Sequence, residues 1–179
     1  MNFRNTLIAA TLVFAHFLAN AQNVQQKDNI KKGKDVLKGY VATYKYKKKL
    51  AQQTLNQKIK DAHLKASSHK KRFYTFKGVV WPEISPLKLD YYYKLSGKKK
   101  TTLYFVASKG YDNYVLPSND STTANAIMRY LQDLDERIRI TGEINDKQKE
   151  LDKLENKADK TEKNKQQKQE QLDALKKQQ

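Results

Sequence analysis

Residues 87–95 read LKLDYYYKL, and this stretch decides the fold class. Its apolar and aromatic residues alternate with polar ones: Leu87, Leu89, Tyr91, Tyr93 and Leu95 against Lys88, Asp90, Tyr92 and Lys94. Side chains of a β-strand point alternately to the two faces of its sheet, so this pattern predicts a strand with one buried face. TTLYFVAS at 101–108 follows after a turn of the sequence SGKKK. The two stretches should pair as an antiparallel hairpin.

Two more strands and a helix are predicted upstream. VLKGYVATYKY at 36–46 alternates loosely, and RFYTFKGVVW at 72–81 is rich in aromatic and β-branched residues and ends before Pro82. Both compositions favour strands. Between them, apolar residues recur at helical spacing from Leu50 to Ala66. This spacing predicts an amphipathic helix.

The last predicted element is a helix that begins near residue 122 and continues almost to the C-terminus. Asp120, Ser121 and Thr122 are competent N-caps, and Asn119-Asp120-Ser121 also matches a glycosylation sequon. One apolar stripe follows at helical spacing, formed by Ile127, Tyr130, Leu131, Leu134, Ile138 and Thr141. The sequence therefore predicts an α+β domain in β-α-β-β-β-α order. We expect a mainly antiparallel sheet of about four strands, both helices on one face, and a long C-terminal helical extension.

The first 21 residues have the layout of a secretory signal peptide. Arg4 precedes an apolar run from Leu7 to Leu18, and Ala19-Asn20-Ala21 is a small-x-small site. Cleavage is expected before Gln22. The run is too short for the roughly 30 Å hydrocarbon core of a membrane. We expect a periplasmic or secreted protein with no integral membrane segment after cleavage.

Residues 22–142 are predicted to form a basic α+β domain, and residues 143–179 a charged helical arm. The chain has a formal net charge of +17, and residues 22–121 hold 22 Lys and Arg against seven Asp and Glu. This excess favours anionic partners such as nucleic acid, an anionic polymer or a glycolipid surface. Lysines that only keep the domain soluble would give the same composition. Because lysine far outnumbers arginine, we expect a diffuse positive field rather than shaped guanidinium contacts.

Tyrosines and lysines are interleaved on the predicted strands. A basic sheet face with exposed aromatic rings is a surface on which single-stranded nucleic acid or sugar rings stack. Most of the tyrosines are expected to serve the core and its rim. Tyr92 and Tyr104 are exceptions, because each lies opposite the leucine face of its strand. The predicted anionic-ligand surface consists of Lys88, Tyr92, Lys94, Lys98, Lys99, Lys100 and Tyr104.

A heptad pattern runs through the C-terminal arm. Its a and d positions hold Leu151, Leu154, Ala158, Thr161, Lys165, Lys168, Leu172 and Leu175, which are apolar at both ends and polar in the middle. One interpretation is a weak or partner-dependent coiled coil with an association seam at Leu151, Leu154, Ala158, Leu172 and Leu175. The other is a solvated single helix supported by ion pairs four residues apart, such as Asp159 with Lys163.

Residue types that carry catalysis or bind metals are sparse. The chain has no cysteine, and His63 and His69 are six residues apart, which is not a single-face helical spacing. No glycine-rich phosphate loop or Gly-x-Ser-x-Gly turn occurs. We therefore predict no catalytic residue, metal site or cofactor, and a non-enzymatic interaction or scaffold protein. Its partner would be an unknown protein or a second copy bound through the C-terminal helix. The alternative is a binding module for an anionic polymer or glycolipid, and a hydrolase with unidentified residues comes third.

Several stretches together resemble an uncharacterised family of exported Bacteroidota proteins. These are Gln22 after Ala-Asn-Ala, the connection Trp81-Pro82-Glu83-Ile84, the stretch from Gly110-Tyr111 to Leu116, and a helix that runs into a tail rich in Lys, Glu, Gln and Asn. The resemblance implies an α+β domain with an extended C-terminal helix. It implies no activity, ligand or catalytic residue.

Overall fold

The structure is a computed structural model that describes residues 24–70 and 72–176, with side chains described through Gln171. The predicted signal peptide, residues 1–21, lies outside the described residues. The chain divides into two compact units, Met1–Arg139 and Ile140–Gln179. The sheet, the shorter helix and the first part of the long helix belong to the first unit.

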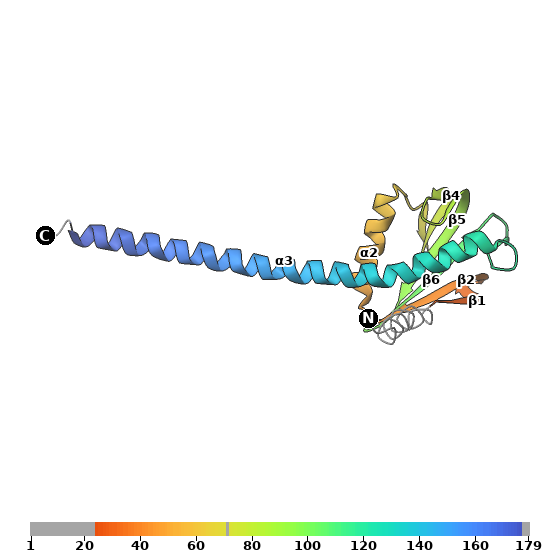
Figure 1. Cartoon of the computed structure of the whole chain (residues 1–179), viewed down its shortest axis with the longest axis horizontal. Coiled ribbons are helices and arrows are strands. Elements are labelled where there is room, and N and C mark those ends of the chain that lie inside the picture. The colour runs from red at the N-terminus through yellow and green to blue at the C-terminus, as the bar shows by residue number, and fades with distance from the viewer. Residues whose placement is uncertain (1–23, 71, 177–179) are drawn as a thin grey trace, which may run out of the picture. The chain divides into compact units, whose positions relative to one another are not determined.

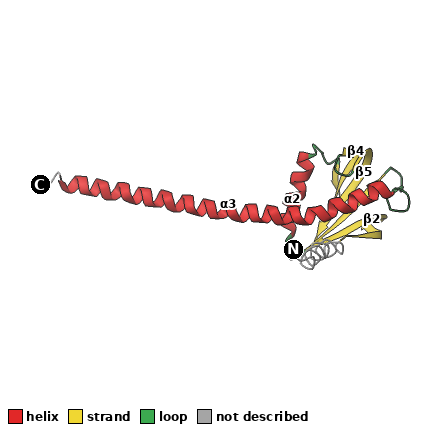
Figure 2. Ribbon diagram, in the orientation of Figure 1, coloured by secondary structure: helices red, strands yellow, loops and turns green. Residues whose placement is uncertain are grey.

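The first unit contains one antiparallel sheet (Figure 2). Its strands are β1 (Val24–Lys32), β2 (Asp35–Tyr44), β3 (Ser68–Lys70), β4 (Phe73–Trp81), β5 (Ser85–Ser96) and β6 (Thr101–Ser108), in the spatial order β1-β2-β6-β5-β4-β3. The two helices are α2 (Lys48–Asp61) and α3 (Ser121–Lys176), labelled in Figure 1. The predicted α+β class, with an antiparallel sheet and a long C-terminal helix, is confirmed.

The sheet has six strands rather than about four, because β1 and β3 were not predicted. β1 reads VQQKDNIKK, and only Ile30 within it is buried. An edge strand of this kind is stabilised by backbone hydrogen bonds to β2 and carries almost no hydrophobic periodicity. β3 is three residues long and pairs only with β4. Neither strand has a side-chain pattern that sequence reading could detect.

The predicted hairpin of β5 and β6 is confirmed and lies in the interior of the sheet. Tyr93 pairs with Phe105, and Leu95 pairs with Leu103. β2 pairs with the other side of β6, where Tyr40 lies opposite Phe105. Aromatic rings from three neighbouring strands therefore lie side by side on one face of the sheet.

Helix α2 ends five residues earlier than the predicted boundary at Ala66. Its last residue is Asp61, and His63 has a positive φ of 53°, which interrupts the helix. The buried side chains of α2 are Ala51, Thr54 and Leu55. They belong to the first two turns, so the predicted apolar positions beyond Ile59 contribute little to burial.

Trp81 lies at the centre of the core. Its ring makes edge-on contacts with Tyr91, Phe105 and Tyr130, with centroids 5.3, 5.6 and 5.4 Å apart. Edge-to-face pairs at such distances add to the free energy gained by burying the rings. Most strand tyrosines face the helices and are fully buried: Tyr40, Tyr44, Tyr91 and Tyr93. Their predicted core role is confirmed.

The first part of α3 covers the same face of the sheet as α2. Residues of both helices share one hydrophobic cluster with the sheet, to which α3 contributes Ala124, Ile127, Tyr130, Leu131, Leu134 and Ile138. Asp120 is the N-cap, because its Oδ1 accepts a 3.0 Å hydrogen bond from the backbone N–H of Thr123. Asp120 thus takes the capping role that the sequence offered to three residues.

The opposite face of the sheet carries a second, smaller cluster. Its buried members are Ile30, Leu37, Phe73, Val106 and Tyr114. Tyr92 and Tyr104 are half-buried and pack against them. These two rings lie opposite the leucine face as the alternation predicted, but they form the rim of an apolar cluster.

Candidate functional site

The predicted anionic-ligand surface falls on β5, β6 and the turn between them. Lys94 and Tyr104 are directly paired across the two strands, with Tyr92 two residues before Lys94 on the same face. Lys98, Lys99 and Lys100 form the exposed turn, and Lys88 is exposed on β5. The structure therefore brings Tyr92, Lys94 and Tyr104 together, while the other four lysines add charge around them.

Lysine ammonium groups of the chain lie over the aromatic rings of this surface. The Nζ of Lys94 lies 4.5 Å from the centroid of Tyr104 and 5.0 Å from that of Phe73. The Nζ of Lys32 lies 4.2 Å from the centroid of Tyr92. Each contact is a cation–π interaction. A base or sugar that stacked on these rings would first have to displace a lysine, which disfavours the stacking mode of binding.

A pocket of about 370 Å³ lies between α2, the connection from β4 to β5, and α3. Within it, the ammonium of Lys58, whose side chain is 10 % exposed, forms an ion pair with Glu83. The Nζ of Lys58 also lies 5.6 Å from the Tyr130 ring. The Tyr130 hydroxyl is buried and has no hydrogen-bond partner among the described residues, and burial raises its pKa.

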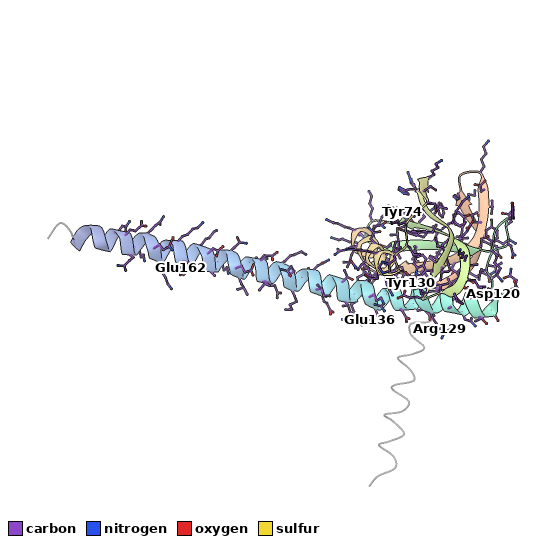
Figure 3. All side chains as sticks on the ribbon, turned by 90° about the horizontal axis from the view of Figure 1, so that it is seen from above. Tyr74, Asp120, Arg129, Tyr130, Glu136 and Glu162 are labelled. Atoms are coloured by element: carbon purple, nitrogen blue, oxygen red, sulfur yellow. The ribbon has the colours of Figure 1, made fainter. Side chains whose placement is uncertain are left out.

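This pocket offers charges but no catalytic pair. Ala126, Arg129, Asp133 and Arg137 on α3 complete its lining, and Figure 3 labels Arg129 and Tyr130 on the helix. No nucleophile with an adjacent general base lines it, as acyl or phosphoryl transfer would require. The ion pair of Lys58 with Glu83 instead links α2 to the connection between β4 and β5.

The described part of the chain has neither a three-ligand metal cluster nor a helix apolar enough to cross a membrane. Across residues 24–70 and 72–176, no group of three or more His, Asp or Glu side chains is placed to hold a metal ion. His63 follows the end of α2, His69 lies within β3, and the two do not form such a group. Of the described helices, none has a stretch long and apolar enough to cross a membrane.

The second unit carries a stripe of exposed apolar side chains, which we call the arm stripe: Ile140, Ile144, Leu151 and Leu154. Their exposed fractions are 41, 62, 48 and 63 %. Side chains stand out on all sides of this part of α3, around the labelled Glu162 (Figure 3). Single exposed leucines are common on protein surfaces, but four large apolar side chains in one row form a candidate interaction surface.

Ile140 and Ile144 extend the heptad pattern in the N-terminal direction. Counting back from Leu151 in steps of four and three gives Lys147, Ile144 and Ile140. Ile138 and Ile140 are two residues apart, a turn of about 200° on an α-helix. The arm stripe is therefore separate from the buried stripe that ends at Ile138. Sequence reading began the heptad pattern at Leu151 and so missed these two isoleucines.

The arm stripe is flanked by charged residues that pair along the helix. Lys147, within the stripe, lies 2.8 Å from Glu150, and Lys149 lies 2.9 Å from Asp146. Both are solvent-exposed pairs three residues apart and stabilise the helix only slightly. Ala158 continues the seam and is exposed. The side chains of Leu172 and Leu175 lie outside the described residues, so their part in the predicted seam stays a prediction.

Comparison of the chain with known proteins does not assign it to a family. No protein-family model matches the chain, and no curated protein matches it.

Proposed function

We propose that this chain is an exported, non-enzymatic scaffold protein whose C-terminal helix pairs with the same helix of a second copy. One observation carries the proposal: the arm stripe is apolar and exposed on a segment of α3, residues 140–171, whose other described side chains are polar except for Ala158. Burying such a stripe against another helix is the usual source of coiled-coil stability. Residues 143–179 hold ten lysines and nine acidic residues, so this segment opposes pairing far less than the basic residues 22–121 would.

An antiparallel pair is favoured over a parallel one by the charges beside the stripe. A parallel pair in register would place Lys147 against Lys147 of the second copy, and Glu150 beside its Glu155. An antiparallel pair centred near Lys149 places Ile144 against Leu154 of the second copy. It also places Glu143 beside Lys157 of that copy and brings Lys147 near its Glu150. This arrangement covers the apolar residues, brings Glu143 and Lys147 near opposite charges, and leaves one like-charge contact, Glu150 beside Glu150 of the second copy.

The apolar part of the seam is short, so the pair should be weak. It extends from Ile140 to Ala158, or fewer than three heptads, and contains Lys147. A polar residue at a core position lowers coiled-coil stability while fixing register. We expect dissociation in the micromolar range, which would let a scaffold assemble where the protein is concentrated.

Cysteine cross-linking tests this arrangement, because the native chain contains no cysteine. In the full chain, the double variant Ile144→Cys/Leu154→Cys should oxidise to a covalent dimer. Each single variant should form little covalent dimer, since in the antiparallel pair two copies of residue 144 lie about 15 Å apart along the helix. Asp146→Cys, away from the stripe, is the control.

Cross-linking outcomes separate the alternatives. Efficient dimers from Ile144→Cys alone would show a parallel pair and overturn the antiparallel arrangement. If neither the double nor the single variants cross-link more than Asp146→Cys, the helix does not self-associate, and the scaffold proposal fails.

Export is proposed from the N-terminal sequence. An apolar run, Leu7 to Leu18, before Ala19-Asn20-Ala21 is the composition that signal peptidases process. Mass spectrometry of the protein from an envelope fraction should find an N-terminus at Gln22. Retention of Met1 in the purified protein would contradict export by cleavage.

A second candidate function, binding of an anionic polymer, is favoured by the exposed lysines of the first unit. Lys98, Lys99 and Lys100 form an exposed turn, and counterion release makes such binding steeply dependent on salt. Replacing all three with Gln should reduce the salt slope of heparin or oligonucleotide binding. The matched control replaces Lys153, Lys157 and Lys160 with Gln and removes the same charge from the helix. Equal effects of both triple variants would exclude a site at the turn.

A further inference from the structure

A second pocket of about 370 Å³ lies beside the hairpin of β1 and β2 and the segment that follows β6. Three tyrosines line it: Tyr92 from β5, and Tyr111 and Tyr114 from the segment after β6. Two carboxylates, Asp35 and Asp112, with Ser108 and the side chain of Lys32, complete its polar lining. All of these residues belong to the first unit, so the pocket is independent of the helical arm.

The segment after β6 holds Tyr111 outward at the rim of the pocket. Its side chain is fully exposed, and both Tyr111 and Asp112 have a φ of 41°, a region that residues other than glycine rarely occupy. Backbone hydrogen bonds keep this conformation, among them a 2.9 Å bond from Lys109 N–H to the carbonyl of Asn113. The ring is thus available to a ligand without a rearrangement of the backbone.

The carboxylates of Asp35 and Asp112 affect the hydroxyl of Tyr114, which lines the pocket. Asp112 Oδ1 accepts a 2.9 Å hydrogen bond from the hydroxyl of Tyr114. Burial, with contributions from Asp112 and Asp35, raises the pKa of Tyr114 to about 12. Burial disfavours charge of either sign, whereas the carboxylates of Asp35 and Asp112 in the lining disfavour a further negative charge and favour a cation.

A cation of the chain itself already occupies this environment. The ammonium of Lys32 lies 4.2 Å from the centroid of Tyr92, in a cation–π contact. Tyrosine rings combined with carboxylates are the chemistry that recognises ammonium ligands. A phosphate or carboxylate ligand would instead face Asp35 and Asp112. The pocket thus differs in character from the lysine-rich surface around it.

We propose that this pocket binds a small organic ammonium ion between Tyr92, Tyr111 and Tyr114, and that Lys32 occupies the position of the ligand in the free protein. Binding displaces the Lys32 side chain toward solvent. The apparent affinity is therefore reduced by the fraction of molecules in which Lys32 fills the pocket. Removal of Lys32 should strengthen ligand binding, which is the opposite of what an anion site would show.

Titration of ammonium compounds into the full chain tests the proposal. Binding is measured by calorimetry and by changes in amide chemical shifts. The probes are choline and butylammonium, with 3,3-dimethylbutanol as the uncharged isostere of choline. The Lys32→Ala variant should bind choline about fivefold more tightly than the wild type. Lys27→Ala, on the same strand but outside the pocket, removes the same charge and should leave the affinity nearly unchanged. Tyr111→Ala should weaken binding about threefold.

Each outcome of the titration decides the proposal. Tighter binding of choline by Lys32→Ala than by Lys27→Ala, with no binding of the uncharged isostere, supports the proposal. The ratio of the choline and butylammonium affinities shows whether a quaternary or a primary ammonium is preferred. Equal binding of 3,3-dimethylbutanol would overturn the requirement for charge. Absence of binding to both the wild type and a folded Lys32→Ala would overturn the site. Inorganic phosphate that binds the wild type and is lost in Lys32→Ala would show an anion site instead.

Discussion

The hydroxyl of Tyr44 on β2 donates a 2.9 Å hydrogen bond to the backbone carbonyl of Leu131 on α3, joining residues 87 positions apart in sequence. This bond is buried and links the sheet to the first part of the long helix. Replacing Tyr44 with Phe should lower the free energy of unfolding by about 1 kcal/mol, because only the hydroxyl is lost. Urea denaturation measures this free energy. As the control, Tyr111→Phe, at a fully exposed ring, should change the free energy of unfolding by less than about 0.5 kcal/mol. Equal losses in both variants would contradict the role of the bond.

Buried tyrosines should make the protein sensitive to alkaline pH. Burial raises the pKa of Tyr40 and Tyr93 to about 12, whereas unfolded tyrosine ionises near pH 10. The folded state disfavours tyrosinate, so this stability is complete below about pH 10 and is lost as the pH rises toward 12. Denaturation measured across this interval should show the free energy of unfolding falling, and less steeply for Tyr40→Phe. A free energy that stays constant would contradict the burial of these hydroxyls.

Asp120 should stabilise the start of α3 as its N-cap. Replacing it with Ala should cost about 1 kcal/mol, while Asn retains an acceptor and should cost less. The hydrogen bond from Thr123 is the largest cause that lowers the pKa of Asp120, and Lys109, 3.0 Å away, also lowers it. Ionised Asp120 therefore adds to the free energy of unfolding above the ordinary Asp pKa. This contribution is lost as the pH falls through the lower pKa that Asp120 has in the folded protein. Comparing the acid unfolding of the wild type and Asp120→Asn isolates this titration, and identical acid profiles would contradict it.

Gly39 on β2 is required by the close approach of β6. A Cβ at this position would lie 2.8 Å from Cγ2 and 3.1 Å from Cα of Val106. Gly39→Ala should destabilise the protein by about 1–3 kcal/mol through overpacking, measured by thermal unfolding. Gly78 has a φ of 58° but open space at its Cβ position, so Gly78→Ala should cost only backbone strain, about 1–2 kcal/mol. If Gly39→Ala were neutral, the register of β2 on β6 would have to differ.

Elements with a strong side-chain pattern could be predicted from sequence. The alternation of Leu89, Tyr91 and Tyr93 predicted strand β5 and its buried face, because every second side chain of the strand packs against the helices. β1 was missed because its pairing with β2 is a property of the backbone, while its side chains are polar. The end of α2 was misplaced because the apolar spacing continues through the residues where the chain turns at His63.

The candidate sites were less accessible to sequence reading than the fold. Tyr92 and Tyr104 were assigned to the face opposite the leucines, but nothing in the sequence shows that Lys32 and Lys94 lie over aromatic rings there. The pocket at Tyr111 depends on pairing between strands that are distant in sequence. Ile140 and Ile144 could have been found, because the four-three spacing extends back from Leu151 to both.

Pairing and folding should depend on different apolar residues of α3. Leu131 is fully buried, so Leu131→Ala should lower the free energy of unfolding by about 2–5 kcal/mol. Leu151 is 48 % exposed, so Leu151→Ala should change the stability of the monomer by less than about 0.5 kcal/mol while weakening association. Denaturation at low protein concentration distinguishes the two variants. A large loss of monomer stability in Leu151→Ala would contradict the solvent exposure of the stripe.

The most direct test of the central claim is the weight-average mass of the full chain, measured by light scattering during size exclusion over a range of concentrations. We predict a monomer at low concentration and a dimer at high concentration, at both low and high salt, because the seam is apolar. Ile144→Asp should remain monomeric throughout while keeping the wild-type circular dichroism. A wild-type chain that stays monomeric at every concentration, or a dimer that Ile144→Asp leaves intact, would contradict self-association through the arm stripe.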